Sequence, residues 1–286
     1  MDDGKLRALL TAVDCGSFSK AAAQLGYTQS AMTHLVNKLE AEIGCTLLER
    51  DSQGIRLTDA GRQLLPYIQN VVCACDTLLQ EAAEQSDPRK RTLRIGCFAS
   101  IARARLPELL RAFRAEHPEI QLDVLVRSEE LQAALASGRI QLALVDEARA
   151  KGFDFQPLAD APLVAAVPPD FPWEGDIIPL ERLLREPFLS SPDQYIEPFL
   201  PADAPRIEVS ASDDGAILSM VAAGLGVAVL SSFSLVGYEE RVRVLQLEQP
   251  IALRLGAAVK SINAAGTSAR TFLSFLCAYY GQEERL

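Results

Sequence analysis

The chain has 286 residues, a formal net charge of −10 and a hydrophobic content of 49%. That length accommodates a small N-terminal unit followed by one or two larger lobes, and the apolar content supports real cores. No run of about 18 apolar residues occurs, which argues against a membrane span. The N-terminus MDDGKLRALL lacks the basic and apolar regions of a secretory signal. We therefore expect a cytoplasmic protein.

Residues 17–43 predict two helices joined by a tight turn. The apolar positions of the first helix recur at helical spacing: Phe18, Ala21, Ala22 and Leu25. Gly26 ends that helix, because glycine adopts positive φ without a steric penalty, and Thr28 is a good N-cap for the next one. The second helix carries a buried stripe: Met32, Val36, Leu39 and Ile43. Such a pair is typical of a helix-turn-helix, which places its second helix in the DNA major groove.

The second helix also carries a polar stripe of short side chains. Gln29, Thr33 and Asn37 share one face, and Ser30 and His34 lie beside it. Glutamine can bond adenine N6 and N7 together, and serine or threonine can bond base edges or touch a thymine methyl group. The stripe therefore suits base reading, although a solvated helix face would look the same.

A hairpin follows the two helices. Strand-like runs at Leu47–Arg50 and Ile55–Thr58 surround the hairpin-forming residues 51–54. This is the pattern of a wing, and the two arginines that flank it are placed to touch phosphates. The predicted DNA-contacting residues are Thr28, Gln29, Ser30, Thr33, His34, Asn37, Lys38, Arg50 and Arg56.

The charge of this segment argues against nucleic-acid binding, since the first 59 residues hold six basic and eight acidic residues. Groove entry needs only a local basic rim, so we keep the interpretation. Because phosphate neutralisation supplies most non-specific affinity, we expect weak non-specific binding and a need for dimers or tetramers.

The order and spacing of several segments resemble the LysR-type transcriptional regulators: residues 16–22, 29–31, 39–40, 43–44, 47–50 and 57–61. The match is dense over the first sixty residues and looser to the C-terminus. The resemblance implies a bacterial DNA-binding regulator whose C-terminal domain senses a small molecule, with RNA polymerase as a further partner. This chain has Thr33-His34-Leu35 where the family commonly has Ser-Arg-Gln, which bears on the operator sequence more than on DNA binding.

A long helix is predicted from Thr58 to about Gln85. Its apolar positions alternate by four and three residues, as in a coiled-coil seam: Leu64, Ile68, Val71, Cys75, Leu78 and Ala82. The seam must pack on something, either a second copy of the chain or the helix's own head domain. In the resembled family this helix links the domains and dimerises, which predicts a homodimer, with a tetramer suggested by the family.

Beyond residue 91 strands and helices alternate, which predicts an α/β domain. Strands at 93–97, 120–126 and 140–145 alternate with helices at 106–116 and 129–136, so a parallel or mixed sheet is expected. A crossover near 162–169 leads to a second lobe, and the chain returns over 253–259 to a last helix at 271–280. We expect a winged helix-turn-helix at 1–59, a linker helix at 60–87, a hinge at 88–91 and a two-lobed effector domain, similar to periplasmic binding proteins, at 92–286. Its lobes would comprise 92–162 with 264–286, and 163–263.

Ligands of such folds bind between lobes at strand ends. The candidate effector-binding residues lie at strand ends and helix starts: Ser100, Ile101, Ser128, Ser190, Ser191, Asp213, Gly226 and Val227. Hydroxyl groups and helix N-termini suit a small anion, although caps and turns use the same residues. In the resembled family, positions like Ser100, Ser128 and Ser190 line the effector site.

Nothing in the sequence indicates catalysis, a metal or a cofactor. The two histidines are His34 and His117, and neither is placed to form a triad or a metal site in the cleft. No phosphate-binding glycine loop occurs. The six cysteines lack a C-x-x-C pair, so reduced thiols are expected. Two alternatives remain: a redox-sensing regulator that uses Cys97 or the Cys73/Cys75 pair, and a cytoplasmic small-molecule-binding protein.

Overall fold

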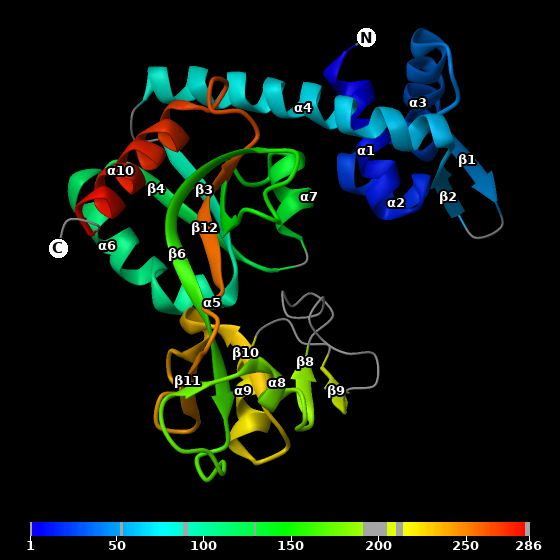
Figure 1. Ribbon diagram of the computed structural model, residues 1–286. Helices are drawn as coiled ribbons and strands as arrows, with labels where there is room; N and C mark the ends of the chain where they lie inside the picture. The colour runs from blue at the N-terminus through cyan, green and yellow to red at the C-terminus, as the bar shows by residue number, and fades with distance from the viewer. Residues whose placement is uncertain are drawn as a thin grey trace. The chain divides into compact units, whose positions relative to one another are not determined.

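The computed structural model describes residues 2–51, 54–87, 91–128, 130–190, 205–209 and 214–283. The chain divides into two compact units, one formed by residues 1–87 with 136–139 and the other by the remainder. Figure 1 labels their elements. Among the described residues, no helix is both long and apolar enough to cross a membrane.

The N-terminal unit is a winged helix-turn-helix followed by a long helix. Its elements are α1 (Asp3–Cys15), α2 (Phe18–Leu25), α3 (Gln29–Ile43), β1 (Leu48–Asp51), β2 (Gly54–Leu57) and α4 (Asp59–Ser86). Helix α1 was not predicted, although its Leu6 and Leu9 lie inside the core with Phe18 and Leu39. The predicted caps are confirmed: Thr28 accepts a hydrogen bond from the Ala31 amide, and Thr58 accepts one from the Gly61 amide.

The start of α4 approaches the wing closely. A Cβ atom at Gly61 would lie 2.2 Å from the Leu47 carbonyl oxygen, so only glycine fits there. Thr58 donates a side-chain hydrogen bond to the Thr46 carbonyl and its amide bonds the Leu47 carbonyl. These contacts fix the hairpin against the first turn of α4.

The C-terminal unit is built on a mixed sheet, which confirms one of the two predicted arrangements. Strand β3 (Thr92–Cys97) pairs in parallel with β4 (Gln121–Val126) and β5 (Leu142–Asp146). Strand β12 (Ala252–Val259) pairs antiparallel with β5 and with β6 (Asp154–Val167). Alternate residues of each strand face opposite sides of the sheet, so the sheet has two separate cores.

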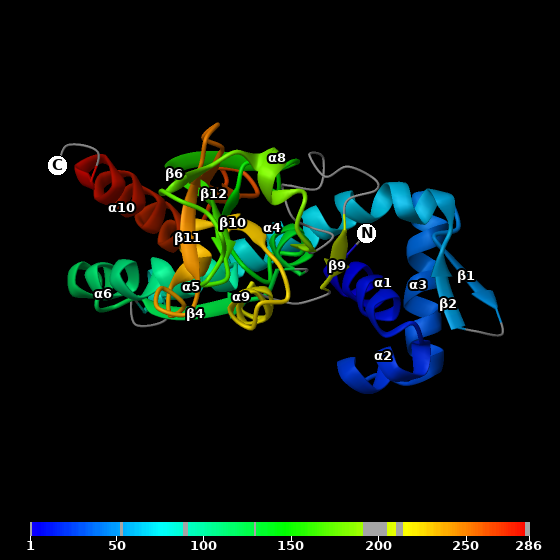
Figure 2. The same ribbon diagram turned by 60° about the horizontal axis from the view of Figure 1, so that its bottom comes forward.

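Different helices cover the two faces of this sheet. On one face lie α5 (Ala99–Ala104), α6 (Leu106–Glu116) and α10 (Thr267–Glu283). Helices α6 and α10 lie side by side in Figures 1 and 2, and their Phe113 and Phe272 rings meet edge to face at 4.8 Å. The short helix α7 (Leu131–Ala136) covers the other face.

The second lobe shares strand β6 with the first. Residues 154–162 of β6 pair with β12, whereas residues 163–167 pair with β10 and β11. The crossover expected near 162–169 is therefore part of one continuous strand, whose residues 163–167 are buried. The remaining elements are β7 (Ile177–Ile178), α8 (Leu180–Leu183), β8 (Phe188–Ser190), β9 (Arg206–Glu208), α9 (Gly215–Ala222), β10 (Ala228–Ser231), a 3₁₀ helix (Ser232–Leu235) and β11 (Arg243–Leu247).

The chain returns to the first lobe earlier than the expected boundary at residue 263. Residues 255–258 of β12 already pair with β5. Ala257 and Val259 are buried in the same core as Phe113. This strand was predicted to belong to the crossover, because the pairing partners of a strand cannot be derived from its local sequence.

Candidate DNA-binding and effector-binding sites

Helix α3 separates an apolar stripe from a polar face. Met32, Val36 and Leu39 are at most 1% exposed. The opposite face carries the predicted reading residues, of which Thr33 is half-buried and these are exposed: Thr28, Gln29, Ser30, His34, Asn37 and Lys38. Within this unit the polar face is therefore not covered by the head's own core.

Two residues of the predicted DNA-contacting set have local partners. The Thr28 hydroxyl caps α3 and lies 3.0 Å from the Ser30 hydroxyl. Both side chains therefore help to define the start of the recognition helix. Gln29 and Thr33 lie one turn apart on the same face of α3, where Gln29 is exposed and Thr33 is half-buried.

The wing hairpin carries the predicted phosphate contacts. Arg50 pairs in register with Ile55, and Glu49 with Arg56, in an antiparallel ladder. Arg56 is exposed. The side chain of Arg50 and residues 52–53 lie outside the described part.

Ionic contacts fix α3 and α4 to α1. The Lys5 ammonium lies 2.5 Å from a Glu42 carboxylate oxygen and 3.0 Å from Asp2. Contact with Glu42, and then with Asp2, raises the pKa of Lys5, and Lys5 in turn lowers the pKa of Glu42. The Arg7 guanidinium lies 2.5 Å from Asp76 on α4 and 2.6 Å from Asp3. The recognition helix and the long helix are thus both held by α1.

The predicted seam of α4 is divided between two uses. Ile68 is 6% exposed and packs in the head core, and Leu64 packs against that core. Leu78 is instead 69% exposed and Val71 is 42% exposed, Cys75 is half-buried and Ala82 is exposed. Four of the exposed apolar positions on α4 lie at spacings of four, three and four and form what we call the open face: Tyr67, Val71, Ala74 and Leu78.

Three of the predicted effector-binding residues have structural roles in the fold. Ile101 packs in the first-lobe core, and Val227 in the second-lobe core. A Cβ at Gly226 would lie 2.1 Å from the Pro187 carbonyl oxygen, so this glycine permits a close backbone approach. Ile101 was selected because it follows a strand, and Gly226 and Val227 because they lie beyond the predicted helix of the second lobe. Core packing uses the same positions. Ser191 and Asp213 lie outside the described residues.

The predicted serines occupy three different places. Ser100 lies half-buried in the first turn of α5. Ser190 ends β8 and is fully buried, and its hydroxyl oxygen has no hydrogen-bond partner among the residues that the structure describes. Ser128 follows β4 and lines a pocket. A buried hydroxyl without a partner is costly, which marks Ser190 as a position suited to a ligand.

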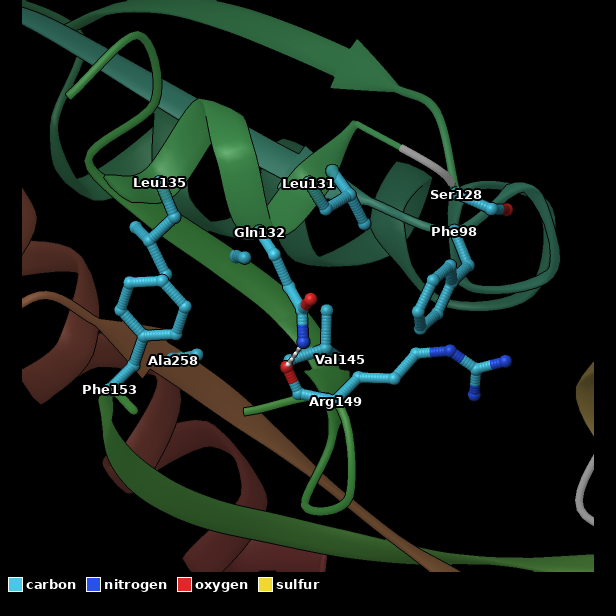
Figure 3. A pocket seen from close by; sticks show the side chains of 10 residues that line it. Phe98, Ser128, Leu131, Gln132, Leu135, Val145, Arg149, Phe153 and Ala258 are labelled. Atoms are coloured by element: carbon cyan, nitrogen blue, oxygen red, sulfur yellow. Dashed lines mark hydrogen bonds between the residues drawn. The ribbon is translucent and has the colours of Figure 1, made fainter. Parts of the chain in front are cut away.

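The pocket beside Ser128 has a volume of about 280 Å³ and lies entirely within the first lobe. We call it the first-lobe pocket. Seven apolar side chains line it: Phe98, Leu131, Leu135, Ala143, Val145, Phe153 and Ala258. Figure 3 shows Phe153 and Leu135 at one end and Ser128, Phe98 and Arg149 at the other, with Gln132 between them.

Hydrogen bonds hold the polar residues of this pocket. The Gln132 amide donates to the Arg149 carbonyl at 2.7 Å, which ties α7 to the turn after β5. The Arg149 guanidinium donates to the buried Asp146 carboxylate at 3.0 Å and lies 5.1 Å from the centre of the Phe98 ring. Sequence reasoning missed Arg149 and Gln132, because a charge in a turn and an amide on a helix are usually solvated.

All six cysteines are free thiols. Cys97 is fully buried, and burial raises its pKa to about 12. Cys73 and Cys75 are half-buried on α4, and Cys277 is exposed on α10. A thiol with so high a pKa has almost no thiolate at neutral pH and is a poor nucleophile.

The comparisons with known proteins identify the class. Residues 4–62 match the bacterial regulatory helix-turn-helix proteins of the LysR family. Residues 86–280 match the LysR substrate binding domain. The chain therefore belongs to the LysR family of transcriptional regulators, with an N-terminal DNA-binding domain and a C-terminal effector-binding domain.

Individual relatives agree with this family. The chain is 35% identical over 172 residues to a probable hydrogen peroxide-inducible genes activator from Mycobacterium xenopi, which covers 59% of this chain and 91% of that protein. Its fold is similar to a full-length OxyR variant from Pseudomonas aeruginosa, with a TM-score of 0.70, 23% identity, and coverage of 98% of this chain and 94% of that one. It is also similar to full-length CbnR complexed with its target DNA, with a TM-score of 0.57, 21% identity, and coverage of 98% and 100%.

Proposed function

We propose that this regulator inserts α3 into the major groove and reads bases chiefly through Gln29 and Thr33. The observation that carries the proposal is the division of α3 into a buried stripe and an uncovered polar face. Gln29 would bond an adenine edge, and Thr33 would bond a base or touch a thymine methyl group. His34 lies on the same exposed face, where Asn37 and Lys38 extend the surface toward the phosphates.

We expect the chain to act as a homodimer joined through the open face of α4. Tyr67, Val71 and Leu78 are 68%, 42% and 69% exposed, and their spacing matches a coiled-coil seam. A second copy of the same helix satisfies this face and brings two recognition helices to successive major grooves. A tetramer would follow if two such dimers associate. Because a DNA-binding regulator acts where the DNA is, we expect a cytoplasmic protein.

We further propose that a small molecule binds between the lobes at Ser100, Ser128 and Ser190. The buried hydroxyl of Ser190, which has no hydrogen-bond partner in the described part of the chain, supports this assignment. The lobes share β6 and β12, so they can change their relative arrangement about these strands. An effector shifts the equilibrium only if it binds one arrangement better than the other, and operator occupancy would follow that shift.

Redox sensing is the alternative that the peroxide-inducible relative suggests. The burial and high pKa of Cys97 argue against that thiol as a sensor. Of the two thiol candidates named from the sequence, that leaves the Cys73 and Cys75 pair. Thiol labelling before and after peroxide treatment separates the two possibilities: protection of Cys73 or Cys75 after treatment would favour redox sensing.

The central test is a competition shift assay with an operator found by genome-wide footprinting. Replacing Gln29 and Thr33 together by alanine should cost about 1–3 kcal/mol per good base contact, which lowers discrimination by roughly 5- to 160-fold per contact. Gln24→Ala, an exposed amide on α2, is the matched control and should leave discrimination unchanged. Unaltered discrimination in the double variant would refute base reading by this face.

A further inference from the structure

The first-lobe pocket opens over a patch of small residues in the sheet. Ala143 of β5 and Ala258 of β12 are direct cross-strand partners, and Gly96 of β3 is in register with Ala143. Over Gly96 the space is filled, since a Cβ there would lie 2.4 Å from Ile140 and 2.7 Å from Leu131. Ala143 and Ala258 both line the first-lobe pocket, where their single methyl groups leave space on this face of the sheet that a larger side chain would take.

The size of the pocket is that of a ligand site. Protein interiors keep few voids larger than a water molecule, and an apolar cavity of about 150 Å³ already accepts benzene. At about 280 Å³ the first-lobe pocket has room for a ring or branched chain with a short substituent. Water would bind poorly at its inner end, where Leu135 and Phe153 supply no hydrogen-bonding groups.

The polar groups of the pocket lie together at the other end. Ser128 supplies a hydroxyl group and Arg149 a guanidinium, and both point away from the apolar end in Figure 3. Asp146 and the Phe98 ring hold the guanidinium in place. Because Arg149 is cationic, this end favours a carboxylate over an ammonium group. A second charge at the inner end would be buried without a partner.

We propose that the first-lobe pocket binds the apolar part of a small monocarboxylic acid, whose ring or branched chain lies over Ala143 and Ala258 and whose carboxylate stays near Ser128 and Arg149. This inference deepens the proposed function, on which it rests, by naming the chemical class of the effector. The acid reaches the pocket from the side of Ser128, the residue that the pocket shares with the predicted interlobe site.

The first test is calorimetric titration of the full-length protein with three probes. We expect 3-phenylpropionate to bind saturably and to raise the melting temperature. Its neutral amide should bind at least tenfold more weakly, because it lacks the charge that Arg149 attracts. Succinate, which has a second carboxylate and no ring, should not bind detectably.

Two variants locate the binding. Ala143→Leu fills the space over the sheet and should abolish binding of the acid, whereas Ala133→Leu, the same change on an exposed position of α7, should leave binding intact. Since extra volume in a core can disturb folding, Ser128→Asp is a second variant that acts at the half-buried rim. It should weaken binding of the acid at least tenfold by charge repulsion and affect the amide less than threefold.

Absence of saturable binding by 3-phenylpropionate, or unchanged binding in both Ala143→Leu and Ser128→Asp, would overturn the proposal. Footprinting on the operator separates this failure from a failure of the proposed function. A specific footprint without acid binding leaves the regulator intact and rejects the pocket. Acid binding that is sensitive to both variants, without any specific footprint, supports the pocket and rejects base reading by α3.

Discussion

Glu40 joins the recognition helix to the wing, and its replacement gives the sharpest prediction about the head domain. One carboxylate oxygen of Glu40 on α3 accepts hydrogen bonds from the backbone amides of Leu47 at 2.6 Å and Leu48 at 3.0 Å. Leu47 is fully buried, so its amide has little access to water once Glu40 is removed. Two charge-assisted bonds therefore fix the chain where it leaves α3 and enters β1.

The magnitude follows from these two bonds. Leaving a buried donor unsatisfied costs about 1–3 kcal/mol, so Glu40→Ala should destabilise this segment by about 3 kcal/mol in total, assuming that water partly replaces the acceptor at Leu48. Glu40→Gln keeps a neutral acceptor and should cost about half as much. The wing would then be held less firmly, and operator affinity should fall with it.

Hydrogen exchange measures this effect in the full chain, where a single unfolding free energy is not defined for two units. Since about 1.4 kcal/mol is a factor of ten, protection of the amides in residues 44–58 should fall roughly 100-fold in Glu40→Ala and roughly tenfold in Glu40→Gln. Glu49→Gln, an exposed carboxylate on β1, should change protection less than threefold. Equal protection in Glu40→Ala and the parent would refute the reasoning.

Three further predictions concern other parts of the chain. Leu78→Asp should sediment as a monomer with the head still folded, whereas Ile68→Ala should destabilise the head by about 2–5 kcal/mol. An intact dimer in Leu78→Asp would reject the open face as the dimer interface. Burial raises the pKa of Cys97 to about 12, so its contribution to the unfolding free energy is complete below the unfolded pKa near 9 and is lost as pH rises toward 12, by at most about 4 kcal/mol. Cys97→Ala should therefore reduce the loss of stability at alkaline pH. An unchanged profile of stability against pH in this variant would contradict the prediction. Gly226→Ala should lower the melting temperature of the second lobe by overpacking against Pro187, and an unshifted calorimetric trace would show that the backbone there is free to move.

Local signals predicted the head domain well because each one acts over a few residues. Thr28 and Thr58 cap helices, and Gly26 takes a positive φ of 71° where α2 ends. The continuous strand β6 was not predicted, because Pro157 and Pro162 within it look like breaks. These prolines lie where the loss of an amide donor is tolerated, and the pairing with β12 passes them at residues 157 and 162.

The first-lobe pocket shows a different limit of sequence reasoning. Its volume arises from two alanines on strands that are far apart in the chain, Ala143 and Ala258, and no local pattern distinguishes them from ordinary core residues. Arg149 has no signal either, because its position beside Phe98 depends on the fold of the turn after β5. By contrast, Ser128, which comes two residues after the end of β4, was among the candidate residues and lines this pocket.

Helix α4 contributes to both the head core and the open face, and its heptad spacing alone does not show which residues belong to which. Leu64, Ile68 and Val72 pack into the head, while Tyr67 and Leu78 remain on the open face. The head therefore cannot rotate about α4 without breaking its own core, and the ion pair between Arg7 and Asp76 resists the same rotation. In the proposed dimer, any change in the angle between the two paired α4 helices would move both recognition helices as rigid extensions of them. The distance between the two α3 helices on DNA would thus be the quantity that dimer geometry controls.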